Sequence, residues 1–115
     1  MKKKKICDFG CGYAGFLSLS KKITKKLYGI ELNQFFLDYL NKHKRYITVS
    51  HNINKFDEKF DIITLFHVLE HLPHQIDILV NIKKKLKKGG KLIIEVPHAK
   101  DFLLEKMNIK EFKNF

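Results

Sequence analysis

The sequence predicts an α/β fold in which about five parallel strands form a doubly wound sheet with helices on both faces. Short apolar segments alternate with segments whose apolar residues recur at helical spacing. A glycine-rich turn at Gly10, Gly12 and Gly15 follows the first apolar segment. No repeat, linker or break in composition divides the chain, so we expect one domain over residues 1–115. Right-handed crossovers then give the strand order 3-2-1-4-5.

The apolar segments place the five strands. The fourth is too apolar for a half-exposed strand, so we expect it near the centre of the sheet. Pro97 ends the fifth because proline lacks a backbone N–H donor. The expected strands are Lys4–Asp8, Leu27–Glu31, Tyr46–Val49, Phe60–Phe66 and Lys91–Val96.

Four helices are expected between and after these strands. Asn33 is a good N-cap for the second helix, and Gly89-Gly90 should supply the left-handed end of the third. The apolar positions of the first helix include Leu19 and Ile23, and those of the third include Val80. The expected helices are Ala14–Thr24, Asn33–His43, Gln75–Lys87 and Asp101–Met107.

Composition excludes several classes of protein. The chain is 44% hydrophobic with 10 Phe, yet no window approaches the roughly 20 apolar residues of a membrane span. Asp8 and the glycines interrupt the apolar stretch that a secretory signal requires. We therefore expect a soluble, cytoplasmic protein without a membrane partner. Cys7 and Cys11 should be free thiols, since no second cysteine pair completes a zinc site.

The net charge of +11 raises the question of nucleic acid. Only Arg45 among the 23 basic residues is arginine, whereas phosphate and base recognition favours the planar arginine fork. Scattered lysine runs are more typical of solvated helix faces. A module that binds nucleic acid or a cofactor without turnover stays open as an alternative.

The polar residues that could carry chemistry follow the ends of the expected strands. Asp8 and Glu31 end the first two, and His51, His67 and His98 lie at or after the ends of the others. Ligands of open parallel sheets bind at these carboxyl ends. One cleft should therefore hold all of them.

The first turn predicts a nucleotide cofactor. Gly10 and Gly12 let the backbone turn sharply beside a ligand, and Gly15 should let the next helix pack closely. A carboxylate at the mouth of the turn, Asp8, would repel a pyrophosphate but attract the ammonium and sulfonium of S-adenosylmethionine. An NAD-dependent dehydrogenase is the alternative within this fold.

Four segments together resemble the class I S-adenosylmethionine-dependent methyltransferases, in the small-molecule branch with a Val-Leu-Glu-His-Leu signature. The resemblance implies a Rossmann-like fold and methyl transfer to oxygen, nitrogen or carbon of a metabolite or a cell-surface saccharide precursor. The segments are Ile6–Gly15, Tyr28–Asn33, Phe60–Pro73 and Leu86–Pro97.

The resemblance also implies which residues hold the cofactor. Glu31 would accept from the ribose hydroxyls, Leu32 would pack on the adenine, and Asn52 and Ile53 would contact its edge. The family usually has an acid where this chain has Asn52, and an amide oxygen can also accept a hydrogen bond. The methionine portion would lie among Asp8, Gly10, Gly12, Tyr13, Phe66 and His67.

Three histidines near the cleft are candidates for general base or acceptor positioning: His71, His67 and His98. The spacing of His67, Glu70 and His71 also fits a metal site on one helical turn, although similar enzymes with a metal have Glu in the first position. No metal is our expectation, and the carboxylate would then orient the start of the helix.

Full domains of this class add an antiparallel hairpin after strand five. Only residues 100–115 follow that strand here, so we expect a chain truncated after it, or a minimal protein completed by a partner. An unfinished sheet edge leaves room for a homodimer. The sequence does not identify the acceptor.

Overall fold

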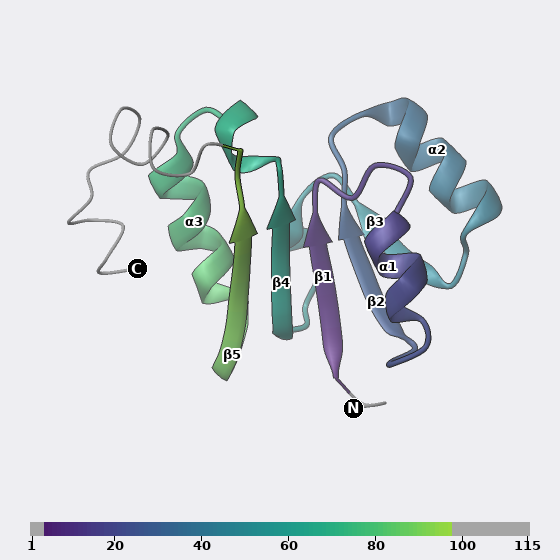
Figure 1. The fold of residues 1–115 in the computed structure, drawn as a ribbon, viewed down its shortest axis with the longest axis horizontal. Coiled ribbons are helices and arrows are strands. Elements are labelled where there is room, and N and C mark those ends of the chain that lie inside the picture. Colours follow the sequence, from purple (N-terminus) through teal and green to yellow (C-terminus); the bar gives the residue numbers. More distant parts are fainter. Residues whose placement is uncertain (1–3, 98–115) are drawn as a thin grey trace.

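The computed structural model describes residues 4–97, which form five strands and three α-helices (Figure 1). The helices are α1 (Gly15–Ser20), α2 (Gln34–His43) and α3 (Gln75–Lys84). Two short 3-10 turns, η1 (Ile53–Lys55) and η2 (Leu69–His71), follow the third and fourth strands. The strands are β1 (Lys5–Phe9), β2 (Lys26–Ile30), β3 (Ile47–Ser50), β4 (Phe60–Phe66) and β5 (Leu86–Glu95).

All strand pairs are parallel, and their order is β3-β2-β1-β4-β5. The predicted fold class and strand order are therefore confirmed. The register places Asp8 between Gly29 of β2 and Thr64 of β4. Every loop that follows a strand consequently starts at the same end of the sheet, which we call the carboxyl end. The opposite end, where the strands begin, is the amino end.

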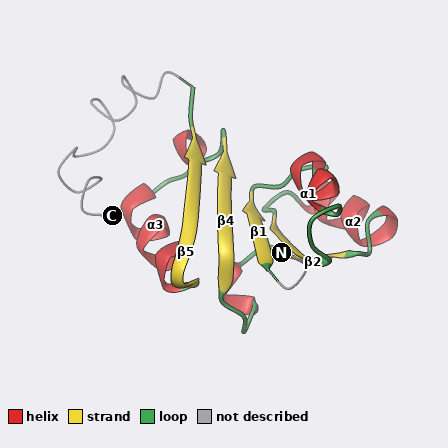
Figure 2. Cartoon of the chain, turned by 60° about the horizontal axis from the view of Figure 1, so that its bottom comes forward, coloured by secondary structure: helices red, strands yellow, loops and turns green. Residues whose placement is uncertain are grey.

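Two apolar cores cover the two faces of the sheet. Leu79 and Ile82 of α3 pack with Ile63 and Leu65 of β4 on one face. Leu17 of α1 and Leu40 of α2 pack with Ile6, Leu27 and Ile47 on the other face. Figure 2 shows α3 at one end of the row of strands and α1 and α2 at the other. The expectation of helices on both faces is confirmed, and the fourth expected helix, Asp101–Met107, lies outside the described residues.

Helix α1 is shorter than the sequence predicts. It ends at Ser20 instead of Thr24, because the Thr24 hydroxyl donates to the carbonyl oxygen of Lys4 at 2.6 Å and draws the chain back toward β1. Leu19 and Ile23, expected to face inward, are 69% and 44% exposed. Asn33 does cap α2 as predicted, because its side chain accepts from the N–H of Phe35 at 2.8 Å.

The glycine pair after α3 was expected to end that helix, and this prediction is wrong. The helix ends at Lys84, and β5 already pairs with β4 at Leu86. Gly89 and Gly90 form a bulge opposite β4, where the register shifts between Phe60 and Ile62. Gly89 has φ +79°, which glycine adopts without strain. Val80 of α3 is also more exposed than predicted, at 46%.

The first glycines differ in what they do. Gly10 has φ +77°, and a Cβ at this position would collide with the side chain of Val68. Gly12 has φ +53° but open space around it. Gly15 begins α1, and a Cβ there would meet nothing within 4 Å, so the predicted close packing at Gly15 is wrong.

Both cysteines are free and buried, as predicted. Burial raises the pKa of Cys11 to about 12, and the nearby carboxylates of Asp8 and Glu31 add to the rise. Burial likewise raises the pKa of Cys7 well above its ordinary value. These thiols are therefore protonated and unreactive at neutral pH. Within residues 4–97, no helix has the length and apolar content needed to cross a bilayer.

The substitution Gly10→Ala should lower the free energy of unfolding by about 2–4 kcal/mol, because it combines a left-handed backbone with overlap on Val68. Gly15→Ala is the matched control and should change stability by about 1 kcal/mol or less, with a gain expected. Urea unfolding of the two variants measures both effects. Equal losses at both positions would contradict this account of the turn.

Candidate functional site

The turn after β1 is bound to the end of β2 through three consecutive backbone N–H groups. Those of Gly10 and Cys11 donate to the carbonyl oxygen of Ile30, at 2.7 and 3.0 Å. That of Gly12 donates to Oε1 of Glu31 at 2.9 Å. The left-handed conformations of Gly10 and Gly12 aim these donors at β2. The turn is thus fixed against the strand that carries the candidate ribose-binding carboxylate.

The carboxylate of Glu31 lies at the centre of this arrangement. Its second oxygen, Oε2, accepts from the N–H of Asn33 at 2.8 Å. A carboxylate offers about four lone-pair directions, so two acceptor directions stay available to a ligand. Glu31 also lines a cleft beside the turn. Hydroxyl donors of a ligand in this cleft would find an oriented acceptor.

Asp8 lies beneath the turn and not at its mouth, where the sequence pattern predicts it. The residue is 6% exposed, and Oδ1 accepts from the Thr64 hydroxyl at 2.7 Å. Burial raises the pKa of Asp8 to about 6, the Thr64 bond opposes the rise, and the charge of Glu31 adds to it. Asp8 can therefore act on a ligand only through its field, while Glu31 supplies the accessible carboxylate.

Two adjoining cavities lie at the carboxyl end of the sheet. The first, of about 210 Å³, is lined by residues that include Gly10, Glu31, His67 and His71. The second, of about 250 Å³, lies toward η1 and α3. Each is smaller than the roughly 300–1,000 Å³ of typical ligand pockets. Both share the lining residues Phe9, Leu32 and Leu72, so a long ligand would occupy the two together.

The predicted adenine residues line the second cavity. Leu32, Asn52 and Ile53 all contribute to its wall, with Leu32 reaching both cavities. Leu32 is 64% exposed, so its side chain is accessible to a ligand in either cavity. The side-chain oxygen of Asn52 accepts from the N–H of Asn54 at 2.9 Å, so it is held in place.

Other predicted cofactor residues line neither cavity. The ring of Tyr13 packs against Phe36 of α2, with centroids 4.7 Å apart. The ring of Phe66 packs against Phe16, with centroids 5.0 Å apart. Gly15 is exposed at the start of α1. The rings of Tyr13 and Phe66 therefore pack on neighbouring aromatic residues, and Gly12 likewise lines neither cavity.

His67 directly follows β4 and has a strained backbone conformation, with φ +56°. Its N–H donates to the carbonyl oxygen of Glu95 at 2.7 Å, and its ring Nε2 lies 2.7 Å from Oε1 of the same residue. Strained non-glycine residues often mark functional sites. His67 and His71 both line the first cavity, whereas His98 lies outside the described residues.

The metal spacing in this segment does not produce a metal cluster. Among residues 4–97, no three His, Cys, Asp or Glu side chains are placed to hold an ion. The turn η2 is a 3-10 turn, so His67 and His71 do not share one face of an α-helix. Glu70 has two buried carboxylate oxygens without a hydrogen-bond donor among the described residues, which is costly.

Sequence reasoning missed several residues of the site. Thr64 forms a hydrogen bond with the predicted Asp8, and Glu95 forms one with the predicted His67. Val68 packs over Gly10. Thr64 carried a usable signal, since it interrupts the apolar fourth strand. Phe9, at the end of β1, and Leu72, after η2, carried none, because an apolar residue at either place is normally assigned to the core.

Comparisons with known proteins identify the family to which this chain belongs. The methyltransferase domain family matches residues 1–114. The chain is 31% identical to the mitochondrial ubiquinone biosynthesis O-methyltransferase of Candida albicans, and 29% identical to the ubiquinone biosynthesis O-methyltransferase of Actinobacillus pleuropneumoniae. Each match covers 77% of the chain, which spans only 31% and 44% of the length of these two relatives.

Solved structures show the same fold. A TehB-like SAM-dependent methyltransferase from Corynebacterium glutamicum superposes with a TM-score of 0.70 at 24% identity, covering 90% of this chain and 63% of that one. The plantazolicin methyltransferase BpumL, solved with a desmethylPZN analog and SAH, gives 0.71 at 19% identity, covering 94% and 46%. The chain therefore belongs to the methyltransferase domain family, with the class I fold of S-adenosylmethionine-dependent enzymes.

Proposed function

We propose that this chain binds S-adenosylmethionine and takes part in methyl transfer to a small-molecule acceptor. The observation that carries the proposal is the bond between the Gly12 N–H and the carboxylate of Glu31. A dinucleotide needs the N–H groups of this turn for its pyrophosphate. Here a carboxylate occupies one of them, which disfavours a diphosphate and suits a cationic nucleoside with ribose hydroxyls. The NAD-dependent alternative is therefore not favoured.

The residues present fit such a cofactor. Glu31 would accept from the ribose hydroxyls, and Leu32, Asn52 and Ile53 would surround the adenine in the second cavity. The methionine portion would extend past Gly10 in the first cavity. Asp8 lies beneath this path and adds negative potential. The two cavities together supply the length that neither has alone.

When bound, S-adenosylmethionine would supply a methyl group already activated on a sulfonium. The task of the protein is then to align the acceptor, a contribution that can reach roughly 7–11 kcal/mol in well-oriented systems. The relatives are named O-methyltransferases, which supports an oxygen acceptor. We also propose that residues 1–115 form one domain and that the protein is cytoplasmic.

We place the proton transfer on the histidines of the first cavity. His67 is held by Glu95 through Nε2, which leaves Nδ1 to accept a proton from an acceptor hydroxyl. His71, from the following turn, lines the same cavity and would position the acceptor. His98 follows β5 in sequence and stays a third candidate.

The central test is calorimetric titration with S-adenosylhomocysteine and, separately, with NAD. We expect binding of the first only. Glu31→Gln should weaken it by about 10- to 100-fold, because a charge-assisted hydrogen bond is replaced by a weaker one. Asp57→Asn is the matched control, since it removes one negative charge from an exposed position away from both cavities.

Failure of the wild-type protein to bind S-adenosylhomocysteine would overturn the proposed cofactor. An equal loss of affinity in both variants would show that net charge alone governs binding. Binding of NAD with similar affinity would favour the dehydrogenase.

A second prediction concerns Asp8. Its pKa of about 6 in the folded protein is above the ordinary value of 3.8, so the folded state holds this proton more tightly than the unfolded chain does. The contribution to stability therefore falls as pH rises between these two values. Asp8→Asn should increase the free energy of unfolding at pH 7.5 by up to about 3 kcal/mol and have little effect near pH 4. Urea unfolding at both pH values would refute this if the difference were the same at each.

A further inference from the structure

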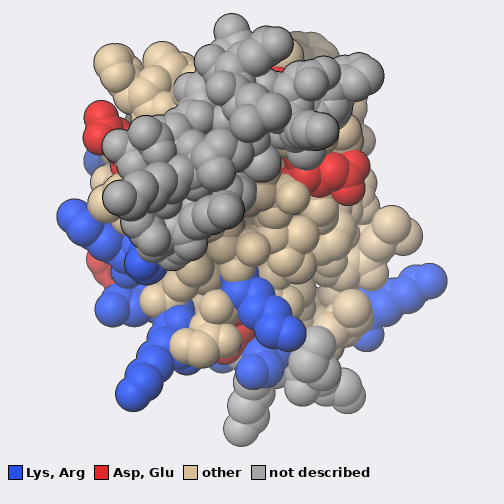
Figure 3. Space-filling model, turned by 60° about the vertical axis from the view of Figure 1, so that its left-hand side comes forward, with Lys and Arg blue, Asp and Glu red and all other residues tan. Residues whose placement is uncertain are grey.

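Lysine-rich segments that are far apart in the sequence meet at the amino end of the sheet. Strands β1 and β2 begin at Lys5 and Lys26, and Lys87 and Lys88 lie at the start of β5. Parallel pairing brings these starts to one end. Figure 3 shows Lys and Arg side chains gathered over the lower part of the molecule, at the end where the strands begin. We call the following residues the lysine surface: Lys4, Lys5, Lys22, Lys25, Lys26, Lys87, Lys88 and Lys91.

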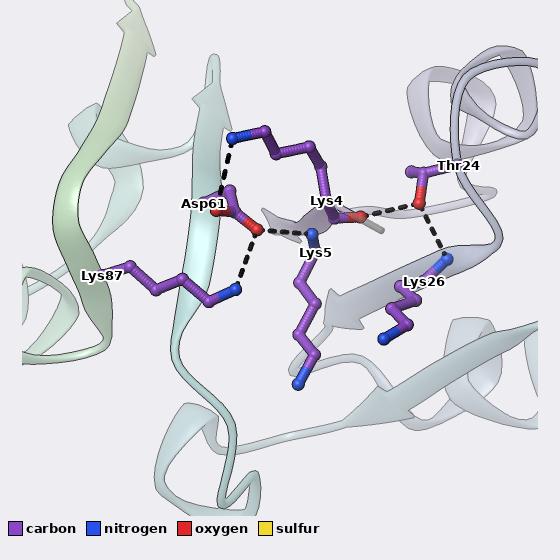
Figure 4. Close-up of polar contacts among 6 residues, drawn as sticks. All are labelled: Lys4, Lys5, Thr24, Lys26, Asp61 and Lys87. Carbon is purple, nitrogen blue, oxygen red and sulfur yellow. Dashed lines mark hydrogen bonds and ion pairs between the residues drawn. The ribbon is translucent and has the colours of Figure 1, made fainter. Parts of the chain in front are cut away.

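Two polar side chains hold these segments together (Figure 4). Asp61 Oδ2 accepts from the Lys5 N–H at 2.8 Å and from Lys87 Nζ at 3.1 Å, and Oδ1 lies 3.8 Å from Lys4 Nζ. The Thr24 hydroxyl donates to the Lys4 carbonyl oxygen at 2.6 Å and accepts from the Lys26 N–H at 3.1 Å. These bonds fix the segments that carry Lys4, Lys5, Lys26 and Lys87 relative to one another.

Positive charge dominates this end of the molecule. The ion pairs of the described residues use Lys4 and Lys87, both with Asp61, and none of the other six members of the lysine surface. Asp57 and Glu58 are the further acids in the loop that enters β4. A hollow of about 250 Å³ opens between Lys4, Lys88 and Lys91, beside the Gly89-Gly90 bulge. A polyanion would meet several unpaired ammonium groups here.

Aliphatic side chains accompany the lysines and indicate which polyanion fits. Leu19 and Ile23, 69% and 44% exposed, lie in the segment that carries Lys22 and Lys25. The ring of Tyr46, which could otherwise stack on a base, is covered by Lys21 at 4.2 Å. Lysines beside exposed aliphatic residues are typical of proteins that bind at a membrane interface, whereas nucleic-acid surfaces offer arginine and free aromatic rings.

We propose that the lysine surface docks on an anionic phospholipid bilayer, with Leu19 and Ile23 entering the headgroup region. This inference does not depend on the proposed cofactor. It runs against the expectation of no membrane partner, which rested on the lack of a sequence window apolar enough to span a bilayer. The candidate cofactor site, at the opposite end of the sheet, would face away from the bilayer.

The test is co-sedimentation with vesicles of phosphatidylcholine alone, or with about 30% phosphatidylglycerol. We expect binding only to the anionic vesicles, and release by about 0.5 M NaCl. Lys88→Glu and Lys25→Glu should each lower the partition coefficient by about 10- to 30-fold. Ile23→Ser should also lower the partition coefficient, although it leaves the net charge unchanged.

Lys55→Glu is the matched control, because Lys55 lies in η1 at the carboxyl end and gives the same change of charge. It should retain nearly full binding. An equal loss in Lys55→Glu and Lys88→Glu would overturn the proposal, as would absence of binding to the anionic vesicles. Tighter binding to poly(U) RNA than to vesicles, unaffected by Ile23→Ser, would assign the surface to nucleic acid instead. Urea unfolding of each variant verifies that the fold is intact.

Discussion

The attachment of the first turn to the end of β2 is the constraint on which the candidate site depends. Three successive N–H groups, from Gly10 to Gly12, are used in this attachment, two on the Ile30 carbonyl and one on the Glu31 carboxylate. Left-handed glycines make it possible, and Val68 closes over Gly10. The N–H groups that could otherwise bind a phosphate are therefore occupied, and the turn presents the Glu31 carboxylate as a hydrogen-bond acceptor. A ligand here must accordingly supply donors such as hydroxyl groups.

Charge is divided between the two ends of the sheet. Asp8, Glu31 and Glu95 lie at the carboxyl end, around the cavities, while the lysine surface occupies the amino end. A cationic nucleoside is attracted to the first end and a polyanion to the second. Although the net charge of the chain is +11, the candidate cofactor site is acidic. Net charge alone therefore does not indicate which ligand this site binds.

Features that follow from local patterns or from general rules of chain topology could be predicted from the sequence, whereas those that depend on register could not. The strand order follows from alternating strands and helices with right-handed crossovers, and the Asn33 cap and the position of Glu31 follow from local spacing. Asp8 was misplaced because its side chain bonds Thr64, 56 residues away, which only the pairing of β1 with β4 brings opposite. Gly89-Gly90 has the local pattern of a helix end, and only the pairing of Leu86 with Phe60 converts it into a bulge.

The central claim is that the Glu31 carboxylate, fixed by the Gly12 N–H, makes this turn a site for a phosphate-free nucleoside. The most direct measurement is a crystal structure of the protein with S-adenosylhomocysteine. The account predicts both ribose hydroxyls within hydrogen-bond distance of Glu31, with the adenine between Leu32 and Ile53. A nucleoside bound elsewhere, or a ribose that does not contact Glu31, would contradict it.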